Sequence, residues 1–409
     1  MTNYWRSVKS VLTGSVIAQL IPVLGSLVIA RLYAPAEFGM FSAWLGLVML
    51  LAVLLTCRYD MALVIEKDGV ERRLAVLSTL VVTGFVSAFF TIVVFGGVFF
   101  LPDLLARYPI VLVLVWLPAA LFLATNNIWQ SWAAAEGEYR KLSYMRIAQA
   151  GLITLFQIIG GLFSSTASVL ALAHLLGLIL ALVLSFCMLP LTDLPKNGIW
   201  LGVVSFWKRQ RRFPIFSLPA DFINTGAAQL PVLIVTARFG ADISGMLAMT
   251  MKVLGAPIGL LGKSVLDVFK RHAATSYFDR GECREEYVKT FNVLSFGSFI
   301  FCFIMFFASE PLFILAFGRE WAQAGVIAVW MLPLFALRFV ASPLSYMVYI
   351  AEKQHLDLIW QIGLLGMTAF SLTTLSGYEV ALKTFSWGYG ALYAIYLLMS
   401  YRFSLGVNR

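Results

Sequence analysis

The sequence predicts an all-α integral membrane protein with about twelve transmembrane helices. Of its 409 residues, 60% are hydrophobic and only 12% are charged, whereas roughly 25% of the residues in soluble domains are charged. The mean hydropathy is +0.87. Uncharged segments recur along the whole chain, each with the ~20 residues that one crossing of a bilayer requires. These three observations exclude a water-soluble fold.

Six spans are predicted in the first half of the chain. No Asp, Glu, Lys or Arg interrupts residues 10–30, 38–57, 74–102, 110–135 and 147–192. The last segment is long enough for two helices, and we place the turn at Ser164-Ser165-Thr166 because hydroxylated residues favour turns. The first span has no small-residue cleavage site, so we expect a retained helix and not a cleaved signal peptide.

Six further spans are predicted in the second half, at residues 213–237, 244–266, 290–308, 322–350, 358–375 and 384–401. Only this half carries charged side chains within its spans, namely Asp221, Lys252, Lys263 and Arg338. The expected organisation is an N-terminal six-helix bundle (1–192), a basic cytoplasmic linker (193–212) and a C-terminal six-helix bundle (213–409).

The distribution of Lys and Arg predicts the orientation of the chain. Most of these residues fall in alternate loops, with dense groups at 58–73, 196–212 and 263–289. Since cytoplasmic loops carry an excess of Lys and Arg, both termini are predicted to be cytoplasmic. The net charge of +9 is then explained without nucleic acid. The run KRQRR at Lys208–Arg212 is better explained by attraction of the linker to anionic membrane lipid.

An internal repeat relates the first span to the seventh. Residues 18–31 read AQLIPVLGSLVIAR, and residues 228–238 read AQLPVLIVTAR. The two copies are six predicted spans apart, so both run in the same direction across the membrane. The halves are therefore predicted to be parallel repeats about an axis along the membrane normal, facing each other across a cavity.

Three segments carry a resemblance to a known family. They are ARLYAPAEFG at residues 30–39, RYDMALV at 58–64, and RRFPIFSLPADFINTGAAQLPVLIVTARFG at 211–240. The chain resembles the polysaccharide flippase branch of the multidrug/oligosaccharidyl-lipid/polysaccharide (MOP) exporter superfamily, and looks most like Wzx-type O-antigen flippases. It departs from that pattern at Ile65-Glu66, where Leu-Pro is expected. The resemblance therefore does not predict the backbone conformation that follows RYDMALV.

The resemblance implies a V-shaped twelve-helix carrier in the bacterial inner membrane. Its substrate would be an undecaprenyl-diphosphate-linked oligosaccharide, moved from the cytoplasmic to the periplasmic leaflet by alternating access. A polysaccharide polymerase and a chain-length regulator are potential partners. Such a substrate has an anionic diphosphate, and its binding requires cations at membrane depth.

Lys252 and Arg338 are the first candidates for binding the diphosphate. Lys252 shares a helix face with Lys263, eleven residues further on, and ionisable residues inside a membrane are functional candidates because their insertion is costly. The alternative for Lys252 is an ion pair with Asp221, and Lys263 can reach the membrane surface. Arg338 lies between Pro333 and Pro343, which predict a bent or broken helix. Its guanidinium suits bidentate diphosphate contact, or a brace with a carboxylate.

Asp221 and Asn224 are candidates for ion coupling or gating. They lie three residues apart at the start of the seventh span, on one helix face. A buried carboxylate there would couple proton or sodium movement to transport, and the alternative is a countercharge to a basic neighbour. Arg58 and Asp60 are candidates for contact with the incoming headgroup, or for an interfacial anchor.

Arg31, Arg238 and Arg146 complete the candidate cations. Arg31 and Arg238 occupy matched repeat positions at the outer ends of their spans, where they would attract the diphosphate or extend to lipid phosphates. Arg146 shares a broad face with Gln149 and Gln157, which would line a cavity or join helices by hydrogen bonds.

No cofactor or metal is predicted. Cys57, Cys187, Cys283 and Cys302 form no CxxC pair, and His174, His272 and His355 lack metal-ligand spacing. The sequence therefore predicts no disulfide, zinc or haem site, and leaves proton or sodium coupling open.

Other functions remain as alternatives. An ion-coupled exporter of another substrate would have the same plan, because a fold does not fix a substrate. A polymerase or acyltransferase of the polysaccharide pathway is disfavoured, since no large outer loop, carboxylate pair or catalytic His stands out. A channel or receptor is a third alternative, but neither function requires the repeat or the buried cations.

Overall fold

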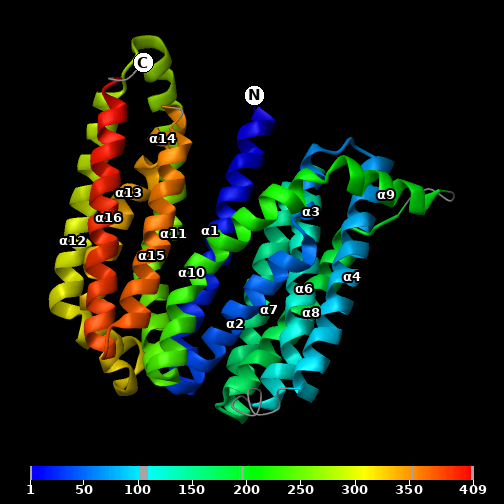
Figure 1. Ribbon diagram of the computed structural model, residues 1–409, viewed down its shortest axis with the longest axis horizontal. Coiled ribbons are helices and arrows are strands. Elements are labelled where there is room, and N and C mark those ends of the chain that lie inside the picture. The colour runs from blue at the N-terminus through cyan, green and yellow to red at the C-terminus, as the bar shows by residue number, and fades with distance from the viewer. Residues whose placement is uncertain (1, 101–108, 193, 195–197, 352, 407–409) are drawn as a thin grey trace. The chain divides into compact units, whose positions relative to one another are not determined.

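Long helices dominate the computed structural model, which describes residues 2–100, 109–192, 194, 198–351 and 353–406 (Figure 1). No strand occurs among these residues. The long helices of the first half are α1 (Thr2–Leu32), α2 (Pro35–Thr56), α4 (Val70–Phe100), α6 (Ile110–Ala135), α7 (Tyr139–Phe163) and α8 (Ala167–Met188). Those of the second half are α10 (Leu218–Phe239), α11 (Ala241–Arg280), α12 (Arg284–Phe317), α13 (Ala322–Leu344), α15 (Gln354–Thr374) and α16 (Tyr378–Ser404).

The predicted spans match these helices in number and order. Of the described helical stretches, 11 are long and apolar enough to cross a membrane. Helix α16, with 27 residues, is not among them because it is rich in Tyr, Ser and Gly. The predicted turn at Ser164-Ser165-Thr166 is confirmed. Thr166 caps α8, and the Ala167 N–H at the start of that helix donates to Glu37 Oε2 at 2.6 Å, as the helix dipole favours.

The helices form two compact units, Met1–Gln229 and Leu230–Arg409, here called unit 1 and unit 2. The division falls inside α10, just before Pro231, and not in the linker at 193–212. The first half of α10 belongs to unit 1 because it packs on α2. A methyl group added at Gly46 would lie 3.3 Å from the Gln229 side chain, and one added at Gly226 would lie 3.8 Å from Leu50.

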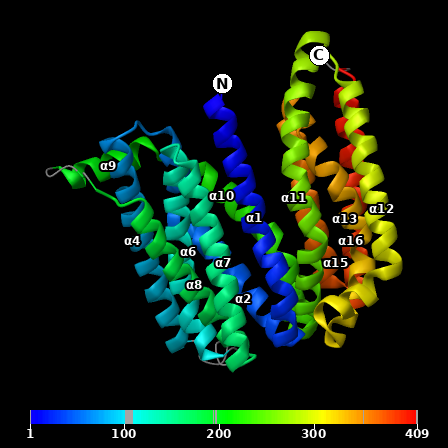
Figure 2. The ribbon, with the colours of Figure 1, turned by 180° about the vertical axis from the view of Figure 1, so that it is seen from behind.

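Small residues bring helices of unit 1 together, as between α7 and α8, which lie side by side (Figure 2). A methyl group at Gly177 of α8 would lie 2.6 Å from Ile153 Cα of α7, so the two backbones are in direct contact. Close approach at glycines is typical of helices in membranes, where packing replaces the hydrophobic driving force. At one end of the unit, buried Trp129 and Trp132 pack with Phe206 of the short helix α9 (Ile199–Arg209).

Unit 2 is organised around α13, which packs on α11, α12 and α16. Ser309 Oγ of α12 donates to the Gly325 carbonyl at 2.8 Å. Next to Pro333, the Leu334 N–H donates to Ser386 Oγ of α16 at 3.2 Å. Helix α13 continues through Pro333 and ends one residue after Pro343, before the short helix α14 (Met347–Ile350). The expected break therefore lies at the second proline.

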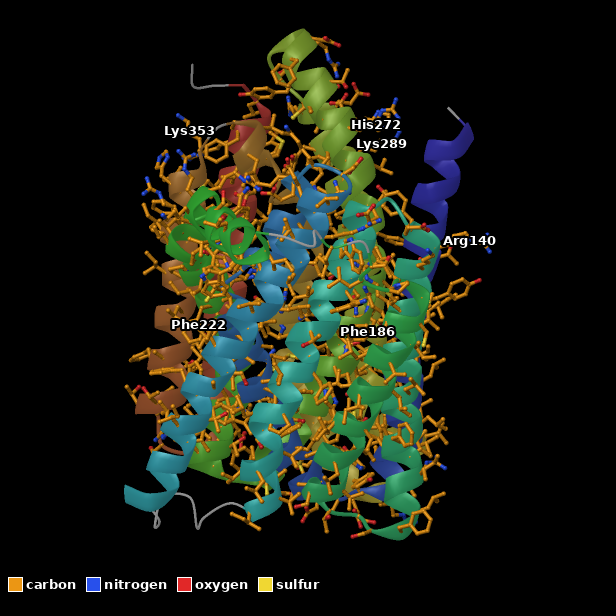
Figure 3. The ribbon with its side chains drawn as sticks, turned by 90° about the vertical axis from the view of Figure 1, so that its right-hand side faces the viewer. Arg140, Phe186, Phe222, His272, Lys289 and Lys353 are labelled. Carbon is orange, nitrogen blue, oxygen red and sulfur yellow. The ribbon has the colours of Figure 1, made fainter. Side chains whose placement is uncertain are left out.

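Charged side chains gather at one end of unit 2. Figure 3 shows His272, Lys289 and Lys353 at this end, although they come from α11, α12 and the segment before α15. These are the segments that the charge distribution assigns to a single side of the membrane.

Candidate functional site

A strained turn after α2 begins the candidate site in unit 1. Cys57 and Arg58 both have left-handed backbone conformations, with φ of 47° and 59°. Residues with a Cβ adopt this conformation only where the surrounding structure holds them, and such strain is common at functional sites. Here the Cys57 N–H bonds to the Leu54 carbonyl at 3.1 Å and the Arg58 N–H to Thr56 Oγ1 at 3.2 Å. The turn leads into α3 (Tyr59–Ala62) and points Arg58 toward α10.

The guanidinium of Arg58 lies between two carboxylates. Its Nε donates to Asp221 Oδ2 at 2.7 Å, and its Nη1 lies 3.5 Å from Asp60 Oδ2. The structure thus brings together three of the predicted site residues, which are up to 163 positions apart in the sequence. Asn224 is exposed on the same helix as Asp221. The predicted basic neighbour that neutralises Asp221 is therefore Arg58, which also belongs to unit 1.

Asp60 is the buried member of this cluster. Only 5% of the residue is exposed, and its Oδ1 has no hydrogen-bond partner among the described residues. Burial raises the pKa of the Asp60 carboxyl above its ordinary value, Asp221 adds to the rise, and the neighbouring Arg58 opposes it. Asp60 is therefore the member of the cluster best placed to change its protonation state.

We expect Asp60→Asn to reduce the pH dependence of folding stability. Because the pKa of the carboxyl is higher in the folded than in the unfolded protein, the folded state binds more protons. The free energy of unfolding then falls as pH rises from the unfolded pKa, about 3.9, through the raised folded pKa. The decrease is about 1.4 kcal/mol for each pH unit between the two values, and asparagine abolishes it.

Thermal unfolding of the purified protein between pH 4 and 8 measures this effect. Asp279→Asn, which changes an exposed carboxyl at the end of α11, is the matched control and should follow the wild type. An Asp60→Asn curve parallel to the wild-type curve over the whole pH range would contradict the expectation.

The departure at Ile65-Glu66 has a structural role. Glu66 has φ −80° and ψ 148°, a conformation that proline also adopts, so the backbone does not require proline here. The buried carboxylate of Glu66 accepts hydrogen bonds from Arg209 and from Gln210 Nε2, the latter at 2.5 Å. Arg72 Nη2 donates to the Glu66 carbonyl at 2.8 Å. Glu66 thus joins the segment after α3 to the end of α9.

Lys252 and Arg338 lie on neighbouring helices of unit 2. Lys252 is half-buried on α11, and Arg338 is exposed on α13. Near Lys252, Thr250 Oγ1 donates to the Ala324 carbonyl of α13 at 2.9 Å. A methyl group at Gly255 would lie 3.8 Å from Phe335, one turn before Arg338. The described residues of unit 2 place no carboxylate within ion-pair distance of either cation. The Lys263 side chain lies outside the described residues.

Among the remaining arginines, Arg238 and Arg146 have hydrogen-bond partners within their own units. Arg238 Nη1 donates to the Leu372 and Leu375 carbonyls, at 2.7 and 3.2 Å, and so caps the end of α15. Arg31 is exposed at the last turn of α1. Arg146 Nη1 donates to Ser15 Oγ at 2.9 Å, and its Nε to Gln130 Oε1 at 3.4 Å. Arg146 therefore joins α1, α6 and α7.

The sequence did not predict two features of unit 1. The first is the set of hydrogen bonds made by Glu66, for which the only signal is a glutamate at a position where the family resemblance gives a proline. The imidazole of His174 on α8 is buried against Phe41 and Trp44, and neither ring nitrogen has a hydrogen-bond partner among the described residues. An isolated His in an apolar run gives no signal for such an environment. No group of three or more potential metal ligands occurs within the described part of the chain.

The structure resembles solved transporters of the MOP superfamily. The lipid II flippase MurJ in an inward closed conformation matches with a TM-score of 0.74 and 15% identity, over 95% of this chain and 87% of MurJ. The MATE multidrug transporter DinF-BH in complex with R6G gives 0.61 and 16%, over 97% and 94%. An inward-facing MATE family transporter gives 0.59 and 10%, over 97% and 93%. At these identities, the likeness shows the fold alone.

The sequence itself matches one family model. The model describes polysaccharide biosynthesis proteins and covers residues 28–326, while no curated protein matches the chain. The family model thereby confirms the predicted polysaccharide family, and the structural likeness confirms the all-α membrane fold that MOP superfamily transporters share. The chain is thus a multi-pass membrane protein with the MOP transporter fold, and it belongs to the polysaccharide biosynthesis protein family.

Proposed function

We propose that the protein is a flippase for undecaprenyl-diphosphate-linked oligosaccharides. It would move an O-antigen or other surface-polysaccharide repeat unit from the cytoplasmic to the periplasmic leaflet of the bacterial inner membrane. The observation that carries the proposal is the combination of a polysaccharide biosynthesis family with a transporter fold. A protein of that family with that fold has a lipid-linked glycan as its most direct cargo.

The charges within the spans support an anionic cargo. Lys252 and Arg338 have no carboxylate partner in the described part of unit 2, so each is available to a phosphate group. Helices α11 and α13 are in contact at Gly255 and Phe335. Arg338 lies one turn after Phe335 along α13, whereas Lys252 lies about one turn before Gly255 along α11. The two cations are therefore at different depths, and we propose that they bind the diphosphate in succession. The polyprenyl tail would remain in lipid.

The cluster of Arg58, Asp60 and Asp221 is proposed to couple transport to ion movement. Arg58 binds the two carboxylates in this structure. An arriving diphosphate would compete with them for the guanidinium, and Asp60 would then take up a proton. Ion-coupled export of a different substrate is the second candidate function, because the fold is shared with multidrug transporters such as DinF-BH.

The decisive experiment is deletion of the gene in the native host, with a complemented strain as control. Lipid-linked intermediates are extracted, and their length and leaflet are determined. A flippase deletion should trap complete single repeat units on the cytoplasmic leaflet. Single units outside that are never polymerised would instead indicate a polymerase. An unchanged lipid profile would favour an exporter of another substrate.

A further inference from the structure

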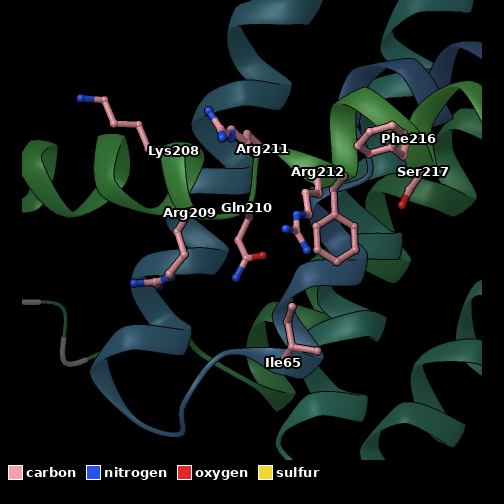
Figure 4. A pocket seen from close by; sticks show the side chains of 9 residues that line it. Ile65, Lys208, Arg209, Gln210, Arg211, Arg212, Phe216 and Ser217 are labelled. Atoms are coloured by element: carbon pink, nitrogen blue, oxygen red, sulfur yellow. The ribbon is translucent and has the colours of Figure 1, made fainter.

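A basic pocket lies where α9 meets the start of α10, within unit 1. Its volume is about 610 Å³, and Figure 4 shows the side chains that line it. Four of the lining residues are cationic and fall within five consecutive positions: Lys208, Arg209, Arg211 and Arg212. The π-helical turn Phe213–Ser217, which leads into α10, forms part of the wall.

Most of this positive charge is not compensated. Glu66 binds Arg209 and Gln210 and so neutralises one of the four cations. No carboxylate among the described residues lies within ion-pair distance of Lys208, Arg211 or Arg212. Lys208, Arg211 and Arg212 carry the same charge within five consecutive positions, and an anion in the pocket would offset that charge. Guanidinium groups also match the geometry of phosphate oxygens.

The pocket is fixed in place by the rest of unit 1. Trp207 Nε1 of α9 donates to the Ser78 carbonyl of α4 at 3.2 Å. Phe206 is buried in the aromatic cluster with Trp129 and Trp132. Together with the bonds of Glu66, these contacts fix the backbone that carries the cations before any ligand arrives, which reduces the entropy cost of binding.

Exposed apolar side chains lie in the pocket wall and on the exposed face of α9. Ile65 and Phe216, in the pocket wall, are 63% and 69% exposed, and Trp200 and Leu201 on α9 are 58% and 77% exposed. A short helix with one face in the protein core, exposed Trp and Leu, and a basic end is typical of a helix lying at a membrane surface. A ligand that meets both the cations and these apolar groups must itself be amphiphilic.

We propose that this pocket binds the phosphate of one anionic phospholipid, with Arg211 and Arg212 as its principal ligands. The acyl chains would lie against Ile65, Phe216 and the exposed face of α9. The neutral polar groups of the wall are Ser217 and Gln210, and Gln210 is bonded to Glu66. The wall thus offers little to a glycan, so a phospholipid fits the pocket better than the sugar-bearing end of a lipid-linked oligosaccharide. The bound lipid would hold α9 at the membrane surface.

Lipid retention by the purified full-length protein tests this proposal without reference to transport. The protein is released from micelles that contain phosphatidylglycerol or phosphatidylcholine, and bound lipids are counted by native mass spectrometry. The wild type should retain phosphatidylglycerol in preference to phosphatidylcholine. Arg211→Gln/Arg212→Gln should weaken retention of phosphatidylglycerol by about tenfold, since each basic residue near a membrane surface contributes substantially to anionic-lipid binding.

The matched control is Arg140→Gln/Arg402→Gln, which removes the same charge from exposed positions on α7 and α16. Figure 3 shows Arg140 projecting away from the helices. If the control and the pocket variant retain the same amount of phosphatidylglycerol, the proposal is overturned. If the pocket double variant does not fold, Lys208→Gln with Phe216→Ala replaces it, and unchanged retention there would count equally against the pocket.

Undecaprenyl diphosphate serves as the competing probe. Binding of this lipid that depends on Arg211 and Arg212, with no such dependence for phosphatidylglycerol, would assign the pocket to the transported lipid and overturn the phospholipid assignment. Neither outcome depends on whether the protein is a flippase, because the gene deletion tests that separately.

Discussion

Alanine at Lys252 or at Arg338 is expected to reduce transport at least tenfold, while the protein remains folded. Both cations lie in spans of unit 2 without a carboxylate partner among its described residues. Placing Lys or Arg at the centre of a membrane helix costs ~2.5–3.5 kcal/mol on insertion scales. Removing either charge therefore relieves a cost, and the stability of the variant should be unchanged or higher. Loss of activity with gain of stability is typical of functional residues.

A structural role predicts the opposite result for stability. If either cation were half of a buried ion pair, its removal would leave an unpaired charge and destabilise the fold by about 3–5 kcal/mol. The two roles are separated by measuring surface polysaccharide in the complemented deletion strain together with the thermal unfolding of the purified variants. Lys252→Arg should keep much of the activity. Arg338→Lys should lose most of it, because lysine cannot make bidentate contacts.

Lys289→Ala is the matched control, since it removes an exposed cation near the start of α12. It should transport at the wild-type rate. Full activity in both Lys252→Ala and Arg338→Ala would remove the two residues from the proposed substrate path, without bearing on the fold or the family.

The spans were predictable from the sequence because a lipid environment leaves few choices. Each crossing needs about 20 uncharged residues with all backbone hydrogen bonds satisfied internally. Residues 110–135, for example, coincide with α6. Hydropathy does not detect the part of a helix that extends beyond the membrane, such as the end of α11, which reaches Arg280 and not the predicted 266. It also does not detect a short helix with one buried face, such as α9 with its 11 residues.

The candidate site was only partly predictable. Charged residues within spans are conspicuous, so Asp221, Lys252 and Arg338 could be identified individually. Their partners could not, because tertiary packing decides them. Arg58 lies 163 positions from Asp221, and nothing local indicates that pair. Arg238 suited a lipid phosphate equally well in the sequence, and only the position of the α15 carbonyls reveals that it caps that helix.

Alanine at Gly177 or at Gly325 is expected to destabilise the protein, although alanine is the better helix former by about 1 kcal/mol. A methyl group at Gly177 would lie 2.6 Å from Ile153 Cα, and one at Gly325 would lie 2.6 Å from Glu310 Cα. Both contacts are to backbone, which cannot rotate away as a side chain can. The helices must separate, and overpacking of this kind costs about 1–3 kcal/mol.

Gly84 and Gly151 provide matched controls in the same fold. They lie in α4 and α7, and a methyl group added at either would meet nothing within 4 Å. Gly84→Ala and Gly151→Ala should therefore unfold at or above the wild-type temperature, whereas Gly177→Ala and Gly325→Ala should unfold below it in the same detergent. Because α7–α8 contact lies in unit 1 and α12–α13 contact in unit 2, the two variants probe the packing of each unit separately. Equal unfolding temperatures for all four variants would mean that these helix pairs are not in backbone contact.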